Sequence, residues 1–91
     1  MNQPLTAIHN QSSQCFELLV DGHRAYLDYQ VLADGRLDYH HTFVPNELRG
    51  RGVAAILTQA ALDYASANGL EVLPSCSYVE TFMRRQQKRE S

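Results

Sequence analysis

Two Asp-Gly pairs, at positions 21–22 and 34–35, constrain this chain more than any other feature. Asp-Gly readily adopts the positive φ angles of a tight hairpin turn. Around the pairs, apolar and polar residues alternate with the period of two that is typical of half-buried strands. The alternating segments are 15–20, 24–31 and 36–44. The sequence therefore predicts a three-stranded antiparallel meander in the first half of the chain.

The third segment ends at Pro45, which lacks the N–H that a strand ladder needs. Its alternation predicts one face formed by Leu37, Tyr39, His41 and Phe43. His40 and His41 are neighbours on this strand, so they point to opposite faces unless a bulge intervenes. Only one of the two imidazoles is therefore expected to face a site on a given side of the sheet.

The second half of the chain predicts two helices and a strand. Apolar residues at spacings of three and four predict a helix over Val53–Asn68, and Gly69 supplies the left-handed residue that ends it. A short strand is expected at Leu70–Leu73, then a helix over Ser77–Arg85 with Ser75 or Ser77 as its N-cap. Because strand–helix–strand crossovers are right-handed, the last strand is expected to lie parallel to the third. The predicted fold class is α+β, a mixed sheet in the order β-β-β-α-β-α.

The chain of 91 residues is long enough for one hydrophobic core and too short for two. We expect a single domain over residues 14–85. Residues 1–13 are polar and turn-rich, which predicts a flexible arm with a short strand near Thr6–Asn10. Residues 86–91 are expected to form a frayed tail.

The charge balance and the cysteine count argue against several classes of protein. A formal net charge of −2 does not indicate a nucleic-acid-binding protein, which usually carries a basic excess. No apolar run approaches the ~20 residues of a membrane span, and the N-terminus has no signal-peptide pattern. Cys15 and Cys76 are too few for a disulfide framework, and the histidines show no metal-ligand spacing. We expect a cytoplasmic protein with reduced thiols, no metal, and neither a nucleic-acid nor a membrane partner.

A glycine-rich loop, Arg49-Gly50-Arg51-Gly52, joins the third strand to the first helix. A helix N-terminus has unpaired N–H groups and the positive end of the helix dipole, and glycines let a phosphate approach the backbone. Two arginines beside this terminus oppose the dipole unless an anion binds. The segment lacks the Gly-Lys-Ser/Thr of a Walker loop and the third glycine of a dinucleotide fingerprint. It predicts a phosphate cradle of another kind, and a tight turn without a ligand is the alternative.

The segment Arg49–Ala54 matches the pattern Arg/Gln-x-x-Gly-x-Gly/Ala, an acetyl-coenzyme A pyrophosphate motif. Here the chain resembles the GNAT N-acetyltransferase superfamily, in its minimal single-domain Yjdj-type branch. The segments that carry the resemblance are 42–45, 48–54, 61–65 and 69–79. It extends over about residues 14–85 and implies a reduced GNAT-like fold. Two features depart from it: Asp21-Gly22 leaves no room for the helices usual between the first strands, and Arg84–Gln87 replaces an Arg-His-Pro-like segment.

The resemblance implies acetyl-coenzyme A as co-substrate. The backbone amides of about Arg51–Ala54 would hold the pyrophosphate, with Arg49 as the leading residue of the motif. The pantetheine arm would lie between His41–Val44 and Glu71–Leu73, and an amide near the end of the third strand would polarise the thioester carbonyl. The expected cofactor-binding residues are therefore Phe43, Val44, Arg49, Gly50, Arg51, Gly52, Val53 and Ala54.

Cys76, His41 and Tyr78 are the candidate catalytic residues. Cys76 lies at a predicted helix N-terminus, a location that lowers a thiol pKa. Its possible roles are general acid toward the leaving thiolate, acetyl-accepting nucleophile, or packing. His41 is a general base for the amine or a core histidine. Tyr78 is a proton donor, a role that the resemblance implies, or an anchor of the last helix.

We therefore expect a small N-acetyltransferase that transfers acetyl from acetyl-coenzyme A to an amine acceptor, which is a small molecule or a protein. The alternative is a non-catalytic acyl-coenzyme A-binding module or sensor without an acceptor site, because the chain is short. The sequence identifies neither the acceptor nor the oligomeric state.

Overall fold

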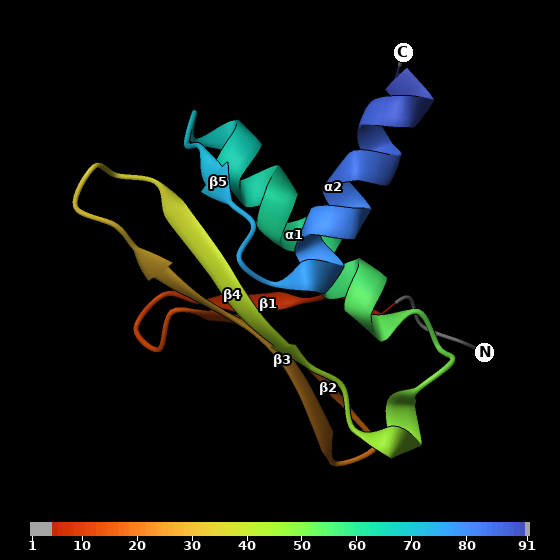
Figure 1. The fold of residues 1–91 in the computed structure, drawn as a ribbon. Coiled ribbons are helices and arrows are strands. Elements are labelled where there is room, and N and C mark those ends of the chain that lie inside the picture. Colours follow the sequence, from red (N-terminus) through yellow and green to blue (C-terminus); the bar gives the residue numbers. More distant parts are fainter. Residues whose placement is uncertain (1–4, 91) are drawn as a thin grey trace.

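The computed structural model describes the backbone of residues 5–90 and the side chains of residues 5–87. One five-stranded sheet is covered on one side by two helices (Figure 1). The strands are β1 (Ile8–Asn10), β2 (Cys15–Val20), β3 (His23–Val31), β4 (Leu37–Phe43) and β5 (Val72–Leu73). They lie in the sheet in sequence order. The helices are the short 3-10 turn η1 (Asn46–Leu48), α1 (Val53–Ala67) and α2 (Ser77–Glu90).

The predicted meander and crossover are confirmed. The three pairs from β1 to β4 are antiparallel, and β5 lies parallel to β4 through the register Leu37–Val72 and Asp38–Leu73. The first hairpin turns at Asp21 (φ 51°) and Gly22 (φ 80°). Positive φ at both central residues is the turn geometry that matches the twist of neighbouring strands. The predicted α+β fold class is therefore correct.

A bulge in β4 changes the predicted faces of that strand. Asp28 of β3 pairs with His41, but the next residue, Tyr29, pairs with Tyr39, so His40 is an extra residue in β4. A bulge inverts the alternation beyond it. Leu37 and Tyr39 point into the core, whereas His41 and Phe43 point to the other face. The prediction that these four residues share one face is therefore wrong, and so is the alternative of a core histidine at position 41.

The core lies between the inner face of the sheet and the helices. Its buried residues include Phe16, Leu18, Leu27, Leu37 and Tyr39 from the sheet, and Val53, Leu57, Ala61, Ala65 and Val79 from the helices. The Tyr39 hydroxyl donates a hydrogen bond to the carbonyl of Ala61 (2.6 Å), which ties β4 to α1. Thr58 is also fully buried, and its hydroxyl bonds the carbonyl of Ala54 in the preceding turn. These contacts fix the position of α1 against the sheet.

The second helix differs from its predicted form at both ends. It continues to Glu90 rather than ending at Arg85, because residues 86–90 are good helix formers without a stop signal. At its start, the amide of Glu80 donates to the carbonyl of Cys76 (3.0 Å), and Ser77 is the first helical residue. Cys76 is therefore the N-cap, not Ser75 or Ser77. This places the thiol directly at the helix N-terminus.

Part of the predicted N-terminal arm belongs to the sheet. The short strand expected near Thr6–Asn10 is present as β1, paired with β2. His9 of β1 stacks on Phe16 (centroids 4.2 Å apart) and its Nε2 lies 2.6 Å from the hydroxyl of Tyr29. These contacts hold one edge of the sheet in place.

Candidate functional site

The glycine loop between η1 and α1 has the geometry of an open anion cradle. Leu48 is buried and anchors the start of the loop. Gly50 (φ 81°) and Gly52 (φ 73°) are left-handed, and a Cβ built on either would contact nothing within 4 Å. Glycine is therefore required here by the backbone conformation, and the space above the loop is open.

The amides at the start of α1 are unpaired. Gly52 is the N-cap, without a side-chain cap, and the first turn has no acidic residue. The first helical hydrogen bond runs from the amide of Ile56 to the carbonyl of Gly52 (3.1 Å). Within residues 5–90, the amides from Gly50 to Ala55 donate to no backbone carbonyl. Such orphan N–H groups, at the positive end of the helix dipole, are suited to an anion.

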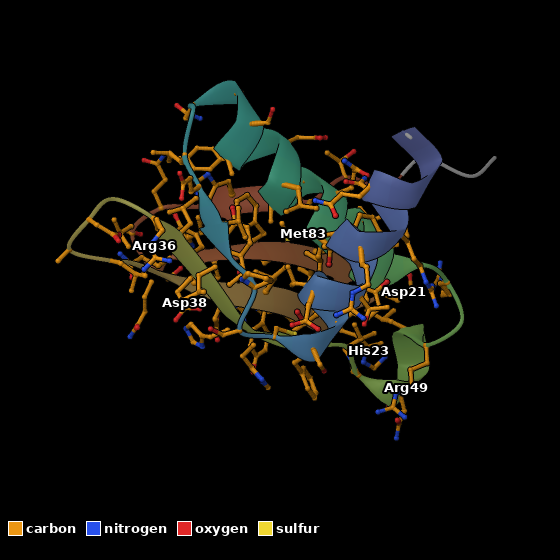
Figure 2. All side chains as sticks on the ribbon, turned by 45° about the horizontal axis from the view of Figure 1, so that its top comes forward. Asp21, His23, Arg36, Asp38, Arg49 and Met83 are labelled. Atoms are coloured by element: carbon orange, nitrogen blue, oxygen red, sulfur yellow. The ribbon has the colours of Figure 1, made fainter. Side chains whose placement is uncertain are left out.

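Two arginines extend from this loop. Arg49 and Arg51 are both exposed, and Arg51 lies 3.7 Å from the carboxylate of Asp21 in the first hairpin turn. Figure 2 shows Asp21, His23 and Arg49 gathered at one end of the molecule, while Arg36 and Asp38 lie away from them along β4. Within the part of the chain whose side chains are described, Arg49 forms no ion pair. The loop therefore carries uncompensated positive charge.

A cleft opens where β4 and β5 separate. The strands pair at only two positions, and the last link is a hydrogen bond from the Cys76 amide to the carbonyl of Tyr39 (2.9 Å). Beyond it lies a hollow of about 550 Å³. Its walls are His40, His41, Thr42, Val44, Arg49, Ala54, Ser75, Cys76, Ser77 and Tyr78. A second hollow of about 230 Å³ lies over the glycine loop and shares Val44, Arg49, Ala54 and Tyr78 with the first. One trough therefore leads from the loop to Cys76.

Cys76 lies in this trough opposite Thr42. Their side-chain sulfur and oxygen atoms are 3.5 Å apart. Burial opposes ionisation of the thiol, but hydrogen bonds from the Thr42 hydroxyl and from the amides of Val79, Tyr78 and Thr42 outweigh it. The pKa of Cys76 is therefore below its ordinary value. A thiol with this environment is an improved proton donor and forms thiolate more readily.

Thr42 is a site residue to which the sequence analysis gave no role, although it lies in the segment 42–45 that carries the resemblance. Thr42 pairs with the buried Leu27 of β3, so its side chain points to the inner face, toward Cys76. In an uninterrupted strand the inward residue would be His41. No local signal reveals the shift, because two adjacent histidines in an alternating segment do not indicate a bulge.

The other predicted site residues are divided between the trough and the outer face of the sheet. Val44, Arg49 and Ala54 line the trough, and Val53 is buried beneath it. His41 and Phe43 point to the outer face, where their rings lie 6.0 and 5.5 Å from Tyr26. Within the described part of the chain, the backbone of His41 to Val44 has no strand partner on its β5 side. Any pairing of Phe43 with a ligand in the trough would therefore involve its backbone.

Tyr78 borders both hollows and is 40% exposed, with its ring stacked on Phe82 of the next turn (centroids 6.3 Å apart). Arg84 forms an ion pair with Glu80 one turn before it (2.7 Å), so its charge is compensated within α2. The side chains of Lys88 and Arg89 lie outside the described residues.

Among residues 5–87, no group of three or more His, Cys, Asp or Glu side chains could hold a metal ion. No helix in the described part of the chain is long and apolar enough to cross a membrane.

Comparison with known proteins gives consistent matches over most of the chain. A family model described as GCN5-related N-acetyl-transferase matches residues 15–91. Protein NATD1 of Bos taurus is 32% identical over 83 residues, which cover 89% of this chain and 74% of the relative. Protein NATD1 of Mus musculus is 31% identical, with 89% and 76% covered. Protein NATD1 of Homo sapiens is 31% identical, with 89% and 74% covered.

Proposed function

The chain belongs to the GCN5-related N-acetyltransferase family, and from this premise we propose that it transfers the acetyl group of acetyl-coenzyme A to an amine. The observation that carries the proposal is the continuous trough from the glycine loop to Cys76. One end of the trough suits a phosphate and the other end holds a hydrogen-bonded thiol. Acetyl-coenzyme A has a pyrophosphate near one end and a thioester at the other, so the trough offers an anion cradle for the first and a proton donor beside the second.

The coenzyme binds with its pyrophosphate at the amides of about Arg51–Ala54. Among the described residues these amides donate to no backbone carbonyl, the space beside Gly52 is open, and charge-assisted hydrogen bonds to such donors are strong. Arg49 and Arg51 supply positive charge on the same side. The pantetheine arm then runs along the unpartnered β4 edge at His41–Val44 and brings the thioester close to Thr42 and Cys76.

In the reaction, the amine lone pair attacks the thioester carbon, and the C–N bond forms. A backbone amide of the open β4 edge donates to the developing oxyanion. The C–S bond then breaks, and its electron pair goes to the coenzyme sulfur, which takes a proton from the thiol of Cys76 or the hydroxyl of Tyr78. The lowered pKa of Cys76 supports the thiol as donor. His41, on the outer face, takes the proton that the nitrogen loses.

The test is calorimetric titration with acetyl-coenzyme A and coenzyme A, using Gly52→Glu and the matched control Gly69→Glu. Both glycines are left-handed and open, so both variants carry the same backbone strain. Only Gly52→Glu places a carboxylate among the loop amides. We expect it to weaken binding roughly 100-fold or more, because one or two hydrogen bonds to a charged group are lost.

The control should bind like the unsubstituted protein. Equal loss in both variants would show strain rather than a phosphate site, and no binding of folded protein at millimolar ligand would overturn the proposal. Binding without acetyl transfer over a panel of primary amines would instead support a non-catalytic acyl-coenzyme A-binding module.

A further inference from the structure

The face of the sheet opposite the helices carries a row of aromatic side chains. Tyr26 of β3 and His41 and Phe43 of β4 point to this outer face, because the buried residues beside them point inward and the bulge inverts β4. The Tyr26 ring lies 5.5 Å from that of Phe43 and 6.0 Å from that of His41. Phe43 is 44% exposed and His41 is exposed. We call these three residues the aromatic shelf.

The shelf already accepts a cation at one end. The guanidinium of Arg24 lies 4.6 Å from the centroid of the Tyr26 ring. A cation at this distance is attracted by the negative face of the ring. Arg24 itself is bound to Glu17 by an ion pair of 2.8 Å, so it is held at the β2 side of the shelf. Among the described residues, neither Phe43 nor His41 has a cation over its ring.

Negative charge accompanies the shelf. Asp28 pairs directly across from His41, and Asp38 points to the same face two residues before His40. Neither carboxylate forms an ion pair with any described side chain. The Oδ1 atom of Asp38 is buried and has no hydrogen-bond donor among the described residues. Because Arg24 is paired with Glu17, Asp28 and Asp38 leave this face with net negative charge, whereas the glycine loop carries two arginines.

The shelf and the cleft share a residue. His41 belongs to the shelf through Tyr26 and also forms part of the cleft wall opposite Cys76. Thr42 faces Cys76 from the inner face of β4. A ligand on the shelf would approach the cleft from the outer face of the same strand. An acceptor must attack a thioester in the trough from a side that the coenzyme does not occupy, and the outer face is such a side.

We propose that the aromatic shelf, with Asp28 and Asp38, is the acceptor-side subsite and binds a peptide segment that carries more than one lysine. One ammonium group rests against Phe43 and Asp28 while another reaches the cleft beside His41, and Asp38, farther along β4, adds negative charge to the same face. An open face of a sheet favours a peptide over a free diamine, since small ligands need concave sites that bury most of their surface. The assignment of the shelf as an acceptor subsite rests on the proposed function, but peptide binding to the shelf can be measured without the coenzyme.

The experiment is a titration of the full chain, without coenzyme, with the capped peptide Gly-Lys-Gly-Lys-Gly, monitored by the NMR signals of the Tyr26 and Phe43 rings. The matched peptide has norleucine in place of both lysines, which keeps the aliphatic chains and removes the charges. We expect saturable shifts with the lysine peptide alone. Phe43→Leu and Tyr26→Leu should each weaken binding about 3- to 30-fold, the range of a cation–aromatic contact.

Two control variants separate the shelf from general effects. Tyr26→Phe keeps the ring and should preserve binding. Leu19→Ala changes an exposed apolar residue (69% exposed) on the same face outside the shelf and should leave affinity unchanged. Equal binding of the norleucine peptide, equal loss in Leu19→Ala, or equally tight binding of free 1,5-diaminopentane would each overturn the proposal. The coenzyme titration tests the acetyltransferase proposal separately. Failure of the peptide-binding proposal would therefore not imply failure of the acetyltransferase proposal, and the reverse also holds.

Discussion

Both edges of the sheet are formed by short strands, but the two edges differ in the contacts that hold them. At one edge, β1 has three residues, and His9 closes it by stacking on Phe16, contacting Tyr64 edge-on and bonding Tyr29. At the other edge, β5 has two residues and then departs from β4, which leaves the cleft beside Cys76. Both edges are visible in Figure 1.

The comparison shows that the length of an edge strand does not by itself decide how firmly that strand is held in the sheet. A short edge strand limits unwanted pairing at either side. The two edges differ in their side-chain contacts: those of the first edge meet aromatic rings of the core, whereas the chain after Leu73 turns at Pro74 toward α2. The ring contacts of His9 stabilise the first edge, and the separation of β5 from β4 leaves backbone in the cleft that a ligand can pair with. Substitutions at each edge test this division.

Removing the ring beneath the closed edge should have the largest effect on stability. Phe16 is 2% exposed and contacts His9, Tyr29, Tyr39 and Tyr64. Phe16→Ala should lower the free energy of unfolding by about 3–5 kcal/mol, because it leaves a cavity in the core. Chemical denaturation measures this. Tyr78→Ala at the open edge is the comparison, and it should cost no more than about 1 kcal/mol because that residue is 40% exposed and borders the cleft rather than the core. Similar losses at both edges would contradict the division.

Removing the thiol at the open edge should affect turnover rather than stability. Cys76→Ala should reduce kcat roughly 100-fold if the thiol is a general acid, the lower end of the usual range for proton transfer by a positioned group. Coenzyme affinity should change little. A covalent acetyl-Cys76 route would instead abolish turnover, and acetyl label trapped on the unsubstituted protein would identify it. An unchanged kcat would assign Cys76 to packing and leave Tyr78 as the proton donor.

Acidification should loosen the closed edge. Burial lowers the pKa of His9 below its usual value of 6.5, so the unfolded chain binds a proton more readily than the folded one. The stability that neutral His9 contributes is therefore complete above about pH 6.5 and falls as pH drops through the lower folded pKa. His9→Gln should flatten this part of the stability profile between about pH 7.5 and 5, at the cost of about 1 kcal/mol for the altered hydrogen bond. A profile unchanged by the substitution would place the titrating group elsewhere.

The smallest effect is expected from the Thr42 hydroxyl. Its hydrogen bond lowers the pKa of Cys76, so Thr42→Val should raise that pKa and slow alkylation of the thiol by iodoacetamide about threefold near pH 8. Thr42→Ser keeps the hydroxyl and should retain most of the rate. In the unsubstituted protein the depressed pKa adds stability as pH rises through the folded pKa, and this gain is complete above the ordinary thiol value. Thr42→Val should reduce that alkaline gain.

Local patterns in the sequence were sufficient for most of the elements. The alternation around Asp21-Gly22 predicted β2 and β3, and the three-and-four spacing predicted α1 to within one residue of its end. The crossover rule then predicted the parallel pairing of β5 with β4. These features arise from short-range preferences that act within a turn or a hairpin. The pattern Arg49–Ala54 likewise led to the family that the comparison with known proteins shows.

The tertiary structure decided which residues face the site. The bulge at His40 depends on how β4 pairs with β3, so only the assembled sheet directs Thr42 toward Cys76 and turns His41 and Phe43 to the outer face. The sealing of β1 by His9 depends on rings brought together from β2, β3 and α1. By itself, the sequence determined the order of the elements and the glycine loop, because backbone preference and hydrophobic period are local. The faces of β4 and the cleft required long-range pairing, since a one-residue shift in register inverts every side chain beyond it.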